Sequence, residues 1–122
     1  MTSKRTLVLG ASPNPARYSN IATHRLVQYG HEVIPLGIRK GEIAGLSIEL
    51  EPKNWPDVNT LTLYMNPKRQ LPFYDYILET IRPKRIIFNP GTENEELRAL
   101  AEARGIVCNY ACTLVMLASS QY

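Results

Sequence analysis

Cysteine is scarce in this sequence, and no pattern of metal-binding side chains is present. The 122 residues include two cysteines, Cys108 and Cys112, which are too few and too close together for a disulfide framework. The two histidines lie far from them in the sequence, so no zinc-ligand spacing is found. We therefore expect two reduced, mostly buried thiols, as is usual in the cytoplasm, and no metal site.

Long apolar runs and blocks of like charge are also missing. No apolar run approaches the ~20 residues that a membrane helix needs. Met1 to Arg5 lead directly into a strand-like segment, without the pattern of a signal peptide. The net charge of +3 is small, and the basic residues form none of the blocks that are typical of nucleic-acid binding. The sequence thus predicts a soluble, cytoplasmic protein that binds neither membranes nor nucleic acid.

The composition that remains is that of an ordinary globular protein, 44% hydrophobic and 20% charged. A chain of this length buries enough apolar surface to fold without disulfides or metals. No repeat, linker or low-complexity tract divides it. We therefore predict a single domain that spans residues 1–122.

Short apolar runs alternate with helical patterns along the chain. Strands are predicted at residues 6–9, 32–35, 59–65, 85–89 and 106–108, with a short edge strand at residues 46–50. Helices are predicted at residues 19–29, 67–81, 92–104 and 111–119. Ser19 is the expected N-cap of the first helix, and Thr92 with Glu95 fits a capping box at the third.

This alternation predicts an α/β, Rossmann-like three-layer fold with a five-stranded, mostly parallel sheet. The strands are nearly continuous apolar runs, as expected where a parallel sheet is covered on both faces. The expected strand order is 3-2-1-4-5. In such a sheet, ligands bind at the carboxyl ends of the strands, at the point where the strand order reverses.

Three loops should meet at that edge of the sheet: residues 10–19, 64–68 and 89–94. The first joins a strand to a helix, so free N–H groups at the helix start can face an anion. A phosphate here would pair with Arg17, and Ser12, Asn14 and Ser19 add hydrogen-bond donors. Alternatively, Ser19 only caps the helix and Arg17 is solvated.

The first loop matches neither of the common phosphate-binding motifs. Gly10 alone is present of the glycines in a dinucleotide-binding fingerprint, and no Gly-Lys-Ser/Thr follows to make a Walker A loop. A typical NAD site also has an acidic residue after the second strand. This chain has Arg39 and Lys40 there, after Pro35. Two cations suit a phosphorylated ribose, as in coenzyme A or NADP, although either residue alone also fits an exposed basic turn.

These motifs together resemble the CoA-binding domain family, which comprises small stand-alone proteins similar to the nucleotide-binding domain of the succinyl-CoA synthetase α subunit. The resemblance covers nearly the whole chain. It rests on residues 10–15, Pro35, residues 43–45, residues 91–96 and Cys112. The chain departs from the family pattern after its second strand, where Pro35-Leu36-Gly37-Ile38 replaces Pro-Val-Asn-Pro.

The resemblance implies that coenzyme A, free or as an acyl-CoA, lies extended across the strand ends. The contacts that it implies are Ser12, Arg17 and Ser19 for the phosphates, Arg39 and Lys40 for the adenosine 3′-phosphate, and Asn66, Pro67 and Gly91 for the rest of the ligand. Gly10, Asn14 and Pro35 complete the candidate site. Cys112 is either a thiol that exchanges with coenzyme A or a buried core thiol.

No catalytic residue is predicted, because the sequence offers no Ser-His-Asp set and no paired catalytic carboxylates. We expect a binding module for coenzyme A without catalysis of its own. One alternative is a small NADP-dependent reductase. The other is an interaction protein with a vestigial nucleotide site, which would bind a second copy of itself or an unidentified protein.

Overall fold

The computed structural model describes residues 3–122, and a five-stranded parallel sheet forms its centre. The strands are β1 (Thr6–Ala11), β2 (Val33–Gly37), β5 (Thr60–Leu63), β6 (Arg85–Phe88) and β7 (Val107–Tyr110). They lie in the order β2-β1-β5-β6-β7, and every pair is parallel. Two further strands, β3 (Glu42–Ile43) and β4 (Leu46–Ser47), form a separate antiparallel pair.

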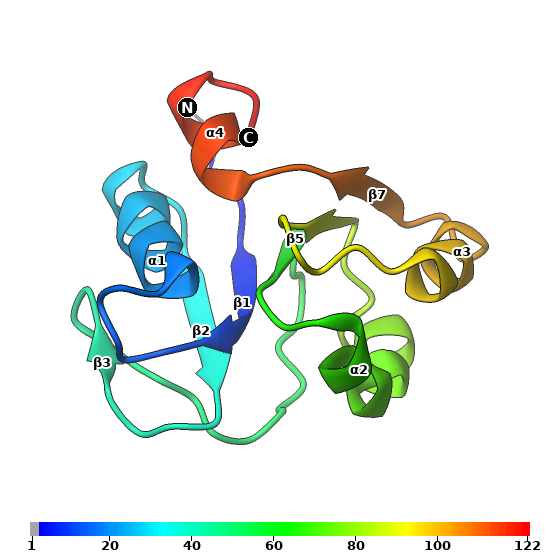
Figure 1. Cartoon of the computed structure of the whole chain (residues 1–122), viewed down its shortest axis with the longest axis horizontal. Coiled ribbons are helices and arrows are strands. Elements are labelled where there is room, and N and C mark those ends of the chain that lie inside the picture. Colours follow the sequence, from blue (N-terminus) through cyan, green and yellow to red (C-terminus); the bar gives the residue numbers. More distant parts are fainter. Residues whose placement is uncertain (1–2) are drawn as a thin grey trace.

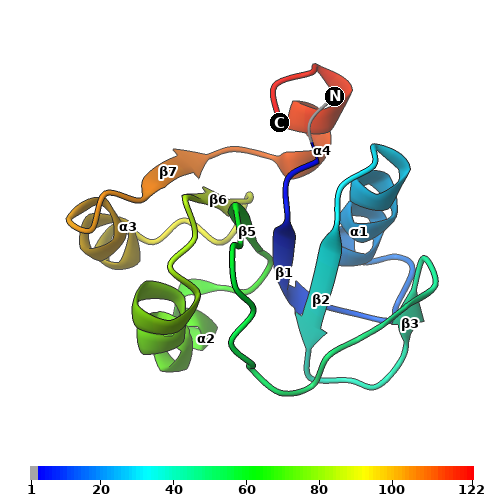
Figure 2. The ribbon, with the colours of Figure 1, turned by 180° about the vertical axis from the view of Figure 1, so that it is seen from behind.

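Helices cover both faces of the sheet (Figure 1). They are α1 (Tyr18–Gln28), α2 (Pro67–Gln70), α3 (Glu95–Glu102) and α4 (Thr113–Ala118), together with the 3₁₀ turn η1 (Leu71–Phe73) and the π-helix η2 (Tyr76–Ile81). Figure 2 shows α1 and α2 on opposite sides of the sheet. The predicted α/β, Rossmann-like three-layer fold is confirmed.

Each face of the sheet has its own hydrophobic core, because residues of a strand point alternately to the two sides. Val8 of β1 packs with Leu26 of α1 and Leu117 of α4. Its neighbours Leu7 and Leu9 pack instead in the larger core that includes residues of η2 and α3. None of the helices in residues 3–122 is long and apolar enough to span a membrane.

The predicted strand order 3-2-1-4-5 is wrong, because the third strand of the sheet, β5, pairs with β1 instead of following β2. The outer edge of β2 is occupied by the chain that leaves it. Glu49 pairs with Leu36, its N–H donates to the Pro35 carbonyl at 2.8 Å, and its carbonyl accepts from the Gly37 N–H at 2.9 Å. The observed order is 2-1-3-4-5 in the numbering of the prediction. The reversal therefore falls between β1 and β5.

Both predicted helix caps are wrong. Helix α1 begins at Tyr18 after the N-cap Arg17, and Ser19 is buried inside its first turn. Helix α3 begins at Glu95, and its N-cap is Asn94, whose Oδ1 accepts from the Leu97 N–H at 3.1 Å. The Thr92 hydroxyl donates instead to the Asn89 carbonyl at 2.8 Å, so it holds the loop before the helix.

The predicted helix over residues 67–81 is broken into α2, η1 and η2. Pro72 lies in the middle of this stretch and has no N–H to donate to the carbonyl four residues earlier. The chain therefore passes through a 3₁₀ turn before it continues as a π-helix. The break leaves α2 as a single turn beside the carboxyl end of β5.

Candidate functional site

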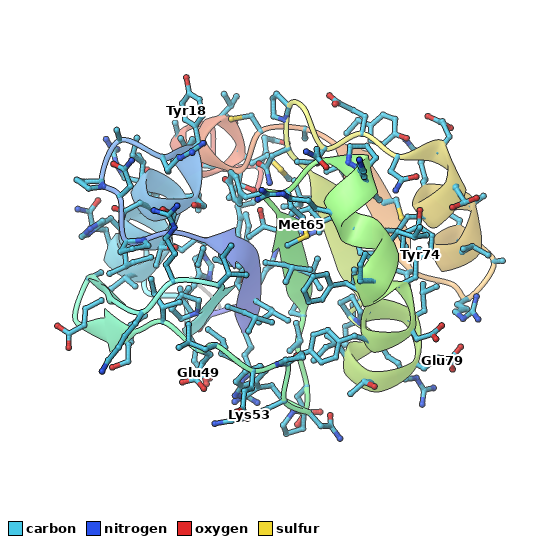
Figure 3. The ribbon with its side chains drawn as sticks, turned by 60° about the horizontal axis from the view of Figure 1, so that its bottom comes forward. Tyr18, Glu49, Lys53, Met65, Tyr74 and Glu79 are labelled. Atoms are coloured by element: carbon cyan, nitrogen blue, oxygen red, sulfur yellow. The ribbon has the colours of Figure 1, made fainter. Side chains whose placement is uncertain are left out.

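A cleft of about 960 Å³ opens at the carboxyl ends of β1, β2, β5 and β6. This volume lies at the upper end of the range for pockets that bind small molecules. Its first wall comes from the segments 10–19 and 36–39, at the ends of β1 and β2, and its second wall from the segments 64–73 and 90–92, after β5 and β6, although not every residue of these segments lines the cleft. Leu50 and Pro52 complete the lining. Figure 3 shows Met65 of the second wall near the middle of this edge and Tyr18 of the first wall projecting at the rim.

Most of the residues predicted from the sequence come together in this cleft. Those that line it are Gly10, Ser12, Asn14, Arg17, Ser19, Arg39, Asn66 and Gly91. The other three lie near the cleft without lining it. Pro35 is buried within β2 opposite Val8, Lys40 is exposed next to Arg39, and Pro67 is exposed as the first residue of α2. A ligand contact by any of these residues stays a prediction.

The charges that line the cleft are all positive. Arg17 and Arg39 lie in the first wall, and Lys68 and Arg69 in the second. No Asp or Glu among the described residues lines it. Lys68 and Arg69 were not among the candidate site residues predicted from the sequence. Their position in the sequence could have identified them, because they directly follow Pro67 in a helical turn that starts where a parallel strand ends.

The first loop is held in shape by its own polar side chains. Ser12 Oγ accepts from the Asn14 N–H at 3.1 Å, and Asn14 Oδ1 accepts from the Ala16 N–H at 3.0 Å. Such short-range turns are typical of Ser and Asn. Asn20 Nδ2 donates to the Ser12 carbonyl at 2.9 Å and ties the loop to α1.

Gly10 is required by packing within the protein. Its φ is +101°, and a Cβ there would lie 2.9 Å from the carbonyl carbon and oxygen of Tyr64. The side chain of any other residue would therefore push the first loop away from the end of β5. Gly10 brings the two walls of the cleft into direct contact at their base.

The end of β2 also depends on close backbone approach. A β-bulge in β1 lets Ala11 pair with Gly37, and a Cβ on Gly37 would lie 2.2 Å from the Ala11 carbonyl oxygen. A Cβ on Gly41 would lie 2.6 Å from Cβ of Pro13. These contacts hold the basic turn with Arg39 and Lys40 against the first loop.

Asn89 anchors the loop that follows β6. Its side chain is buried, and Nδ2 donates to the Thr62 hydroxyl at 2.7 Å and to the Leu63 carbonyl at 2.8 Å. Its Oδ1 accepts from the Thr113 N–H at 2.9 Å. Gly91, further along this loop, has a φ of +91° and open space where a side chain would project, so a ligand can approach its backbone.

Few groups near the cleft can exchange protons at neutral pH. Burial raises the pKa of Tyr64 to about 12, and the nearby Thr113 and Thr62 hydroxyls, which bond to each other, oppose the shift only in part. Cys112 is half-buried before α4 and does not line the cleft. Cys108 is buried in β7, and burial raises its pKa to about 11. No group of three or more His, Cys, Asp or Glu in residues 3–122 could hold a metal ion.

Comparison with known proteins is consistent with this geometry. The family model described as CoA binding domain matches residues 4–118. An uncharacterized protein of known crystal structure is 48% identical over the full length of both chains, with a TM-score of 0.97. A conserved hypothetical protein from Pyrococcus furiosus is 34% identical, with 93% of this chain and 98% of that chain covered and a TM-score of 0.79.

A hypothetical protein from Pyrococcus horikoshii OT3 is 26% identical, with 93% of this chain and 80% of that chain covered and a TM-score of 0.75. No curated protein matches the chain significantly. The family match extends over nearly all of the described residues and includes both walls of the cleft. The chain therefore belongs to the CoA binding domain family.

Proposed function

We propose that this protein binds coenzyme A, free or acylated, along the cleft, and that it does so without catalysing a reaction on its own. The observation that carries the proposal is the charge of the cleft, which four cations and no carboxylate of the described residues line. Coenzyme A is an extended polyanion with a diphosphate and a 3′-phosphate. Cations on both walls suit a ligand whose charges are spread along its length.

The positions of the side chains suggest that each wall contacts a different part of the ligand. Arg17 in the first wall suits the diphosphate, beside the start of α1, where backbone N–H groups and the helix dipole favour an anion. Arg39 and Lys40, held against the first loop by Gly41, suit the 3′-phosphate. Asn66 and Gly91 of the second wall would then contact the remaining length of the ligand.

The chemistry of the lining supports binding rather than catalysis. No Asp, Glu, His or Cys of residues 3–122 lines the cleft. These residue types supply most general acids, bases and nucleophiles in enzymes. Tyr64 lines the cleft, but its pKa of about 12 keeps it protonated at neutral pH.

A titration with coenzyme A, dephospho-CoA, NADP and NAD at fixed salt tests the proposal. A ligand that binds only the folded protein raises the melting temperature by mass action. We expect the largest shift with coenzyme A and a smaller one with dephospho-CoA. Arg17→Ala should weaken binding of coenzyme A by about 1.5–3 kcal/mol, the value of a hydrogen bond to a charged group.

Two results would contradict the proposal. A shift with NADP but not with coenzyme A would favour the reductase. The absence of a shift with all four ligands would favour an interaction protein that has kept the fold and lost the site. Wild-type affinity in Arg17→Ala would remove that residue from the site.

A further inference from the structure

The second wall of the cleft contains a buried glutamine that the proposed function does not use. Gln70 is the last residue of α2, and its side chain is completely buried. Nε2 donates to two backbone carbonyls, those of Met65 and Thr92, each at 2.8 Å. Oε1 accepts from Asn94 Nδ2, also at 2.8 Å. Both amide hydrogens and the carbonyl oxygen of this side chain are therefore paired.

These bonds join two segments that are separate in the sequence, residues 65–70 and residues 92–94. Met65 follows β5, Thr92 lies in the loop after β6, and Asn94 is the N-cap of α3. Two of the partners are backbone carbonyls, so the bonds fix the course of the chain itself. Met65 and Thr92 both line the cleft. One side chain thus sets the spacing between the two loops of the second wall.

The two cations of the second wall directly precede this anchor. Lys68 and Arg69 are exposed on the single helical turn that ends at Gln70. A turn of four residues has little stability of its own. It is held at its start by Asn66, whose Oδ1 accepts from the Arg69 N–H at 3.0 Å, and at its end by the buried Gln70 amide. The direction in which the two cations project therefore depends on Gln70.

Burial of this amide is costly for the protein unless each polar atom is paired. An amide that is taken from water without hydrogen bonds is strongly destabilising, and long side chains also lose rotamer freedom. An apolar residue of the same length would fill the same space at lower cost. The bonds to Met65 and Thr92 are what such a residue could not supply.

We infer that Gln70 is a positioning residue that holds the Lys68–Arg69 turn and the Pro90–Thr92 loop in the geometry that receives the anionic ligand. This inference rests on the proposed function for its ligand. It acts through preorganisation, because loops fixed before binding need not be ordered when the ligand arrives.

The test compares Gln70→Met, which keeps the length but removes the hydrogen bonds, with the unaltered protein. Gln70→Glu is the second variant, since it keeps the shape and an acceptor but loses both donors to the carbonyls. Leu117→Ala is the control, because Leu117 is buried on the opposite face of the sheet in the core with α1. This variant should lower stability, and Leu117 itself does not line the cleft.

Hydrogen exchange in the absence of ligand is the first measurement. In the structure the Thr92 N–H donates to the Asn89 carbonyl at 2.9 Å and the Arg69 N–H to the Asn66 carbonyl at 3.0 Å. Both amides should exchange faster in the two Gln70 variants. The Arg17 N–H, which donates to the Asn14 carbonyl in the first wall, should exchange as in the unaltered protein. Equal acceleration in both walls, or none in the second, would overturn the inference.

Binding of coenzyme A at low and high salt is the second measurement. Gln70→Met should bind about tenfold more weakly, the loss expected when an ionic contact is displaced, and its affinity should depend less on salt. Leu117→Ala should keep both the affinity and the salt dependence. Weaker binding with an unchanged salt dependence would show that Gln70 does not act through Lys68 and Arg69, and would overturn the inference. If the unaltered protein does not bind coenzyme A, the proposed function is wrong, and the exchange rates alone decide whether Gln70 holds the two loops.

Discussion

The two walls of the cleft are held together by opposite means. In the first wall, the chain segments touch because side chains are missing: Gly37 lies against the Ala11 carbonyl, and Gly41 against the Pro13 ring. In the second wall, the segments are joined by added side chains, the buried amides of Gln70 and Asn89. Side-chain hydrogen bonds shape the first loop internally and tie it to α1, but close backbone approach joins that loop to the end of β2, whereas side-chain hydrogen bonds join the segments of the second wall.

This difference determines how each wall should respond to substitution. A steric contact fails as soon as any side chain is introduced, because backbone atoms cannot move far without breaking the strand pairing. A hydrogen-bonded contact fails in steps, since a substitution can remove one bond and leave the others. Any added side chain in the first wall should therefore cause a large loss of stability. In the second wall, the loss should depend on how many hydrogen bonds a substitution removes.

The largest effect is expected for Gly37→Val in the first wall. A Cβ at this position would lie 2.2 Å from the Ala11 carbonyl oxygen, so β1 and β2 must separate locally. We expect the free energy of unfolding to fall by about 3 kcal/mol, at the upper end of the cost of overpacking. Chemical denaturation measures this change.

Gly30→Ala provides the matched control for this variant. Gly30 follows the C-cap residue of α1, Tyr29, and has a φ of +85°, but a Cβ there would meet nothing within 4 Å. Only the left-handed backbone conformation should matter, at a cost of about 1 kcal/mol. Equal losses for Gly37→Val and Gly30→Ala would show that the contact with Ala11 carries no special constraint.

A smaller and graded effect is expected for Asn89 in the second wall. Asn89→Leu removes three hydrogen bonds and leaves buried groups unpaired, for a loss of about 2 kcal/mol in the free energy of unfolding. Asn89→Asp should cost less at a pH low enough to keep its carboxyl protonated, because the neutral acid still accepts from the Thr113 N–H and donates one hydrogen bond. Equal losses in the free energy of unfolding for the two variants would contradict this prediction. The second wall would then lose its stability in one step, as expected for the first wall.

The contrast between the walls also explains what the sequence could predict. Apolar runs such as Ile86-Ile87-Phe88 identify strands because burial on both faces leaves a local pattern. The glycines and polar residues of the first loop are likewise local signals, and Arg17 and Arg39 do line the cleft.

The parts that the sequence could not predict depend on contacts between distant segments. The strand order is one such part: β5 pairs with β1, and Glu49 pairs with Leu36 at the edge where the third strand was expected. The cap of α3 is Asn94 and not Thr92, because Thr92 bonds to Asn89. In the sequence, Gln70 is one polar residue among others in a predicted helix. Its role becomes visible only with its hydrogen-bond partners at positions 65 and 92.

The smallest effect is expected for Lys40→Ala. This variant tests which part of the ligand the basic turn of the first wall contacts, and its effect is on binding rather than on stability. Lys40 is exposed beside Arg39 and does not line the cleft, so its charge reaches the ligand through solvent. An exposed ion pair contributes about 0.2–1 kcal/mol, and salt weakens it further. If the basic turn faces the 3′-phosphate, Lys40→Ala weakens binding of coenzyme A and leaves dephospho-CoA unchanged. Equal losses for both ligands, measured by calorimetry at one salt concentration, would place Lys40 near the diphosphate instead. The turn held by Gly37 and Gly41 would then serve the same part of the ligand as Arg17.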